Sequence, residues 1–325
     1  LYCIDTNNKP SNPNYGHYDW VHFNQIEWYR KTSESYRKSD DGNSIPALMF
    51  LHIPLIEYNN IVGQETTAGI QKEGVASSDI NSGLFSSLIE MADVMGVFCG
   101  HDHGNDYIGI DKNIALAFGR RSGADAYGDL EIGARIILLY EGQRKFDSWI
   151  CTRAEGNHTY YYYPSGLSSV DEARLPMLKA TDVKPLKNGV SYSYYEGKFS
   201  KVAEMAGSKK LKEGELLNFS LSPADAEDWM AFEYHAWIKI PETGVYRFYT
   251  FSDDGSVLYI DGKTIVDNDG SHSERRRDGK VYLEKGFHEL KLSYFERYMG
   301  QMLEVGYAAR DIQESIVPDS ILFVK

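Results

Sequence analysis

Hydrophobic and polar positions are patterned differently in the two halves of the chain. Over roughly the first 160 residues, apolar runs typical of buried strands alternate with helix-like stretches, which is the pattern of an α/β fold. Asp19 is placed to cap a helix that runs to about Lys38. Further apolar runs predict a second helix at 83–91 and strands at 1–5, 46–53, 95–99, 107–110, 114–118, 131–140 and 146–152.

The C-terminal part has an almost purely β pattern. Along 288–294, apolar and polar residues alternate as in a half-buried strand. Asp261-Gly262 separates two apolar runs and favours a two-residue hairpin turn, because both residue types tolerate positive φ angles. Alternation and turn residues predict strands at 232–240, 244–251, 257–260, 263–266, 279–283, 287–295 and 302–307.

The change of pattern predicts two domains. A mixed polar stretch with Pro164 and Pro185 indicates a linker at 161–189, between a first domain at 1–160 and a second at 190–325. We find no fixed-period internal repeat, which excludes propellers and solenoids.

Charge and composition exclude several classes of partner. The chain of 325 residues has 34 Lys and Arg against 47 Asp and Glu, so its net charge is 34 − 47 = −13. A field of that sign does not attract nucleic acid or anionic lipid. No apolar run approaches the ~18 residues that span a bilayer, so membrane insertion is not expected.

Two strand ends carry histidines. Gly100-His101-Asp102-His103 directly follows the apolar run 95–99, and His52 follows the apolar residues of another predicted strand. Open α/β folds build their sites at such strand ends, and neutral imidazole is a good ligand for Zn, Fe or Mn. The simpler alternative is that each histidine only caps a carbonyl group.

These motifs, LHIP after one strand and CGHDH-x-ND after another, resemble the C-terminal half of a calcineurin-like metallophosphoesterase related to purple acid phosphatases, over about residues 1–155. The resemblance implies part of a four-layer α/β/β/α sandwich, two divalent or trivalent transition metals (Fe, Zn or Mn) and a phosphoester substrate. It also implies that His52 and His101 share one ion and that His103 binds the other.

The sequence departs from that family ahead of His52. The family's first three metal motifs, which include a bridging Asp, are not found there, and a two-metal site needs that bridge to hold its ions ~3.5–4 Å apart. We therefore expect the N-terminal half of the phosphoesterase to lie outside this chain, and the chain alone to be catalytically crippled. Asp102 and Glu57 are the general-acid candidates. For Asp102 we favour a hydrogen bond to a ligand histidine, and for Glu57 the alternative is a solvated loop carboxylate.

The second domain carries a different resemblance. Ser252-Asp253-Asp254-Gly255-Ser256, followed by the hairpin at Asp261-Gly262, resembles the protective-antigen type of β-sandwich over 190–325. In sugar-binding members of that family a consecutive Asp pair binds Ca²⁺, and sugar hydroxyls complete its coordination, which would assign these roles to Asp253 and Asp254. Asp267, Asn268 and Asp269 on a neighbouring turn could add further oxygen ligands. The alternative is that the Asp pair only caps its turn. We interpret Arg275–Arg277 as a solvated loop, with a contact to phosphate or acidic glycan as the alternative.

Two functions follow from these patterns. The leading hypothesis is a secreted or periplasmic bacterial metallophosphoesterase with an appended glycan-binding domain. The alternative is a carbohydrate-binding or adhesion module whose phosphatase half is a degenerate scaffold. A single-metal histidine hydrolase is disfavoured, because no Glu stands at helical spacing from the three histidines.

Overall fold

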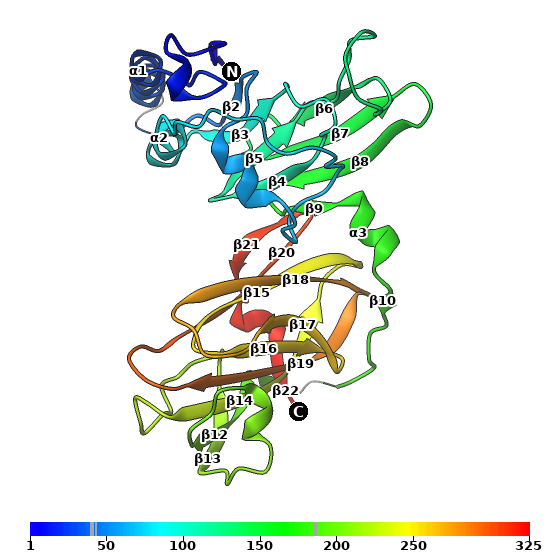
Figure 1. Ribbon diagram of the computed structural model, residues 1–325. Coiled ribbons are helices and arrows are strands. Elements are labelled where there is room, and N and C mark those ends of the chain that lie inside the picture. Colours follow the sequence, from blue (N-terminus) through cyan, green and yellow to red (C-terminus); the bar gives the residue numbers. More distant parts are fainter. Residues whose placement is uncertain (40–41, 43, 185–186) are drawn as a thin grey trace. The chain divides into compact units, whose positions relative to one another are not determined.

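The computed structural model describes residues 1–325 except 40–41, 43 and 185–186. The chain forms two compact units, Leu1–Val170 and Asp171–Lys325, and both are dominated by strands (Figure 1). Among the described residues, no helix has the length and apolar character needed to cross a bilayer.

Unit 1 is built on a five-stranded mixed sheet with the order β1-β2-β3-β5-β4. The pairs β1/β2, β2/β3 and β3/β5 are parallel, and β4 is antiparallel to β5. Parallel neighbours place their C-terminal ends at one edge, which is where the histidine motifs lie. The strands are β1 (Tyr2–Cys3), β2 (Ala47–Phe50), β3 (Val94–Cys99), β4 (Ile108–Asp111) and β5 (Ile114–Phe118).

Helices α1 (Phe23–Ser39) and α2 (Leu84–Met91) cover one face of this sheet. The prediction that Asp19 caps α1 is wrong. The helix begins four residues later, where the Gln25 side chain accepts a hydrogen bond from His22 N (2.8 Å), while Asp19 accepts one from Trp20 N (3.0 Å). Two short 3₁₀ helices, η1 (Pro13–Tyr15) and η2 (Ile56–Ile61), lie in the connections.

A four-stranded antiparallel sheet covers the other face. Phe98, Phe146 and Tyr163 belong to the core between the two sheets. On the outer face of β6, Ile136 and Leu138 remain 37% and 46% exposed. The described part of unit 1 therefore has three layers, which are helices, mixed sheet and antiparallel sheet. The second sheet consists of β6 (Gly133–Leu139), β7 (Phe146–Thr152), β8 (Gly156–Tyr163) and β9 (Leu167–Ser168).

The stretch 161–189, predicted as a linker, contains regular structure. The tyrosine run at 160–163 ends β8, which pairs with β7, because aromatic residues suit a half-buried sheet surface. Pro185 lies outside the described residues. The other elements of this stretch are β9, α3 (Ser169–Arg174), β10 (Met177–Leu178) and β11 (Lys187–Asn188).

Unit 2 is a sandwich of two sheets around one apolar core, which includes Phe232, Phe248 and Leu292. One sheet, in the order β10-β18-β15-β20-β21, contains β18 (Arg275–Leu283), β15 (Gly244–Asp253), β20 (Met302–Ala309) and β21 (Ile312–Ile316). The other contains β11, β12 (Val190–Glu196), β13 (Lys212–Leu216), β14 (Met230–Ile240), β16 (Ser256–Ile260), β17 (Lys263–Asn268), β19 (Gly286–Glu296) and β22 (Leu322–Val324), and η3 (Val202–Met205) and η4 (Asp319–Ile321) lie in connections.

Two local predictions in unit 2 have opposite outcomes. The hairpin is confirmed, since Asp261 and Gly262 join β16 to β17 with φ angles of 48° and 74°. The interpretation of Arg275–Arg277 as a loop is wrong, because these residues begin β18. Arg276 is held there by ion pairs to Asp278 and Glu314, so the run is structural.

Candidate functional site

The acidic residues of unit 2 meet where two strands end. Asp253 is the last residue of β15, and Glu296 is the last residue of β19 in the opposite sheet. A hydrogen bond from Phe295 N to Gly255 O (3.0 Å) joins the two segments. The peptide bond between Asp253 and Asp254 is cis.

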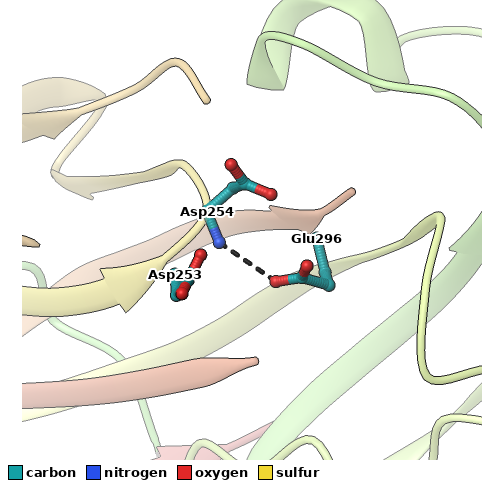
Figure 2. Close-up of side chains that lie close together, drawn as sticks. All are labelled: Asp253, Asp254 and Glu296. Carbon is teal, nitrogen blue, oxygen red and sulfur yellow. Dashed lines mark hydrogen bonds between the residues drawn. The ribbon is translucent and has the colours of Figure 1, made fainter. Parts of the chain in front are cut away.

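The three carboxylates form one cluster. Asp253, Asp254 and Glu296 each offer an oxygen that lies within 4.8 Å of those of the other two (Figure 2). Within the described ranges, this is the one group of three or more His, Cys, Asp or Glu side chains that converges so closely.

Hydrogen bonds fix the geometry of the cluster. The Asp254 carboxylate accepts from the backbone N–H groups of His272 (2.9 Å) and Arg297 (2.8 Å). Its own N–H donates to Glu296 Oε2 (3.1 Å), as Figure 2 shows. The Tyr294 hydroxyl donates to the carbonyl of Asp253 (2.6 Å). The other oxygen, Glu296 Oε1, is buried and has no hydrogen-bond partner.

The electrostatics of the cluster are unfavourable without a cation. Burial, and then the negative charges of Asp254 and Asp253, raise the pKa of Glu296 to about 8. Burial and the charge of Asp254 also raise the pKa of Asp253. Crowded carboxylates with an unsatisfied buried oxygen fit a hard divalent cation such as Ca²⁺, which binds six to eight oxygens.

Of the oxygen ligands predicted near the Asp pair, those at 267–269 do not join the cluster. The Asn268 side chain is engaged with Arg275, whose Nε donates to Oδ1 (2.7 Å), and with Ser252 Oγ (3.0 Å). Asp269 accepts from Val202 N (2.9 Å). Asp267 caps a turn by accepting from Asp269 N (3.1 Å).

Glu296 was not among the predicted ligands, although its place in the sequence carries a signal. Leu290, Leu292, Tyr294 and Glu296 have the same parity along β19, so they point to the same side of the sheet. All four are completely buried. A carboxylate in a core-facing position is costly unless it is paired or binds a metal, and that cost marks the residue as a candidate ligand.

In unit 1 the structure brings two of the three histidines together. Because β2 and β3 are parallel neighbours, His52 and His101 follow adjacent strand ends, and His52 Nε2 lies 3.3 Å from His101 Nδ1. Burial and then the neighbouring His52 and His103 lower the pKa of His101. His103 packs against Tyr127, with ring centroids 4.2 Å apart, and its buried Nδ1 has no partner. Two facing imidazoles fall short of the ligand set of a two-metal centre.

The acid candidates of unit 1 have other partners. Asp102 is buried and accepts from Ala76 N (3.1 Å), in the connection between η2 and α2. We find no bond from it to a ligand histidine in the described part of the chain. Burial raises the pKa of Asp102 to about 6. Glu57 lies on η2 and accepts from the Asn81 side chain (2.8 Å).

Comparison with known protein families identifies the class of unit 2. The model of the PA14 domain matches residues 186–320. The chain therefore contains a PA14 domain, in agreement with the observed β-sandwich and with the predicted protective-antigen type.

Two curated relatives are plant proteins described as probable inactive purple acid phosphatases. The probable inactive purple acid phosphatase 29 of Arabidopsis thaliana is 32% identical over 157 residues, covering 46% of this chain and 40% of the relative. The probable inactive purple acid phosphatase 14 of the same plant is 33% identical over 151 residues, covering 44% and 37%. The chain thus spans about two fifths of the length of these relatives.

Solved structures show partial likenesses. The PA14 sugar-binding domain from an RTX adhesin is 15% identical, covers 43% of this chain and all of that one, and has a TM-score of 0.36. The epithelial adhesin 9 A domain from Candida glabrata, in complex with Galβ1-3GlcNAc, is 11% identical, covers 46% and 95%, and has a TM-score of 0.38.

Proposed function

We propose that this chain is a calcium-dependent carbohydrate-binding module, in which the PA14 domain binds glycan and unit 1 is a catalytically degenerate phosphatase scaffold. The observation that carries the proposal is the cluster of Asp253, Asp254 and Glu296, with a buried carboxylate oxygen that has no partner. The proposal places the module outside the cell, where free calcium and glycans are both available.

The chemistry of the cluster suits such binding. A Ca²⁺ ion would take oxygens from Asp253, Asp254 and Glu296 and would leave coordination positions open. Two neighbouring hydroxyl groups of a sugar can fill those positions, because hydroxyl oxygens are also hard ligands. Asp254 is held in place for this task by two backbone N–H donors.

Phosphoester hydrolysis has weaker support. Of the three predicted histidine ligands, His52 and His101 face each other at 3.3 Å, whereas His103 packs against Tyr127. The two plant relatives are themselves described as probable inactive phosphatases. We expect the purified chain to show no hydrolysis of an aryl phosphate with Mn²⁺, Zn²⁺ or Fe²⁺ added. Turnover that disappears in His101→Ala would overturn the scaffold assignment.

Calcium binding is tested first, by isothermal titration of the chelator-treated protein. We expect one Ca²⁺ per chain, and a loss of at least tenfold in affinity for Asp253→Asn and for Glu296→Gln, since each removes a negative ligand. Glu242→Gln is the matched control. The Glu242 carboxylate is exposed and pairs with Lys285. Glu242 lies just before β15, about 30 Å along that strand from Asp253.

Glycan binding is tested next, on an array of mono- and oligosaccharides ending in galactose, glucose, mannose or fucose. Signals should require calcium, disappear with chelator and be absent in Asp254→Asn. Glycan signals that persist unchanged in chelator and in Asp254→Asn would contradict the proposal, as would a wild-type protein that binds calcium and no glycan.

A further inference from the structure

The outward face of the larger sheet of unit 2 carries aromatic side chains at the end of β14 that is away from the acidic cluster. Trp237 is half-buried and Lys239 is exposed, whereas Ile238 between them is buried in the core. Phe323 of β22 lies directly opposite Trp237, and Phe287 of β19 lies directly opposite Lys239. Directly paired residues point to the same side of a sheet, so these four side chains share the outward face.

Two lysines lie over these rings. The rings of Phe287 and Phe323 are 5.5 Å apart and nearly perpendicular, at 89°. Lys239 Nζ lies 6.0 Å from the centroid of the Phe287 ring, and Lys325 Nζ lies 4.9 Å from that of Trp237. Among the described residues, neither ammonium group has a carboxylate partner. We call Trp237, Phe287, Phe323, Lys239 and Lys325 the aromatic-lysine face.

The charge of the aromatic-lysine face is opposite to that of the whole chain, whose net charge is −13. Its two lysines outnumber the one carboxylate paired with it, that of the exposed Glu289 opposite Trp237. Unpaired cations beside half-buried rings fit a ligand that is both anionic and able to pack on aromatic surface. A sheet face is also open at its sides, so it suits an extended polymer better than a small molecule, which favours a concave pocket.

We propose that the aromatic-lysine face binds an acidic polysaccharide. The C–H face of a uronate ring packs on Trp237 and the phenylalanine rings, and its carboxylate pairs with Lys239 or Lys325. This binding needs no calcium. It is also distant from the acidic cluster, because the partner of Trp237 on β19 is Glu289, about 24 Å along that strand from Glu296.

The test is isothermal titration of the full chain with hexagalacturonate, in chelator and at low salt. The chelator removes any binding through a calcium ion. We expect saturable binding by the wild type that weakens as salt is added, since salt screens exposed charges. The fully methyl-esterified hexasaccharide keeps the sugar rings without their charges, and it should bind about fivefold more weakly or worse.

Four variants locate the binding. Trp237→Ala should lose about tenfold in affinity, which corresponds to ~1.4 kcal/mol for an aromatic contact. Lys239→Gln, at an exposed position where folding is not at risk, should lose about threefold. Glu289→Gln should bind more tightly, because it removes a repelling charge. Trp229→Ala is the matched control: Lys198 Nζ lies 5.1 Å from the Trp229 ring centroid just before the other end of β14, and this variant should keep the wild-type affinity.

The outcomes separate this inference from the proposed function. No binding of hexagalacturonate by the wild type, equal binding of its methyl ester, or full affinity in Lys239→Gln and Trp237→Ala would overturn it. Loss of affinity in Trp229→Ala would place the contact elsewhere and would also overturn it, as would equally tight binding of hexaglutamate, since charge alone would then suffice. None of these results bears on calcium-dependent binding, which is tested with neutral sugars.

Discussion

His288 is a buried titratable side chain away from the cation cluster. Its Nδ1 lies 2.6 Å from Asp261 Oδ2 and its Nε2 lies 2.8 Å from Glu284 O. Burial lowers the pKa of His288, but its hydrogen bonds and the negative charges of Asp261 and Glu284 outweigh burial, so the pKa is raised above 6.5. The protonated form therefore stabilises the fold fully below about pH 6.5, and that stability is lost as the pH rises through the raised pKa.

We expect the free energy of unfolding of unit 2 to fall as the pH rises above about 6.5, and to fall less steeply in His288→Gln. Urea denaturation at a series of pH values, in chelator, measures both slopes. Glu296, whose pKa is also raised, contributes a decrease of the same sign to both proteins, so the difference between the slopes isolates His288. Equal slopes would contradict the assignment.

At the scale of residues, the sequence predicted site residues that are adjacent in the chain, but not those that only folding brings together. Asp253 and Asp254 stand out because they are adjacent in a turn motif. Glu296 joins them from 42 residues further along the chain, and only the pairing of strands in three dimensions decides that. The carboxylate at 267 looked equivalent in sequence, but it faces its own turn.

The close crossing of β17 and β18 gives a prediction at the scale of elements. A Cβ on Gly279 of β18 would stand 1.8 Å from the carbonyl oxygen of Ile265 on β17, and backbone cannot yield as a side-chain end can. Gly279→Ala is therefore expected to cost about 3 kcal/mol or more, in the range of severe overpacking. Thermal unfolding measures the loss.

Gly244→Ala is the matched control for that substitution. Gly244 begins β15, and a Cβ there would meet no other atom within 4 Å. Its effect should stay within about 0.5 kcal/mol. Comparable destabilisation by both substitutions would mean that lost glycine flexibility, and not the crossing, accounts for the effect.

Strands were more predictable than their surroundings. In unit 2 the patterns of apolar and polar residues located the strands from β14 to β20. They missed β12, whose sequence Val190–Glu196 alternates serine with tyrosine. β8 was missed because four consecutive tyrosines show no alternation. Arg275–Arg277 was missed as strand because the charge of Arg276 is balanced by Asp278 and by Glu314 of β21, which a single sequence does not show.

At the scale of the whole molecule, unit 2 should fold alone. Its core residues all come from 190–322, so a fragment of residues 171–325 is expected to unfold cooperatively and to bind calcium as the full chain does. A fragment that begins at 190 removes Asp171, which pairs with the buried Lys280 at 2.9 Å, and the short strands β10 and β11. It should be less stable by at least about 3–5 kcal/mol, the typical cost of breaking a buried ion pair.

Urea denaturation measures the free energy of unfolding of the fragments that begin at 171 and at 190. Equal stability would show that the ion pair adds nothing, and an unfolded 171–325 fragment would show that unit 2 depends on unit 1. With 161–189 predicted as a linker, the shorter fragment would have been chosen, beginning at 190. A polar segment next to prolines does not reveal that the Asp171 carboxylate is buried.

Two carboxylates of the candidate site, Asp253 and Glu296, end strands of opposite sheets. A calcium ion bound there would cross-link the two sheets at that end of the sandwich. It would do so only where calcium is plentiful. Binding to the native state alone stabilises by RT ln(1 + [L]/Kd). If the proposed calcium binding holds, unit 2 would gain stability and the capacity to bind sugar only where calcium is plentiful.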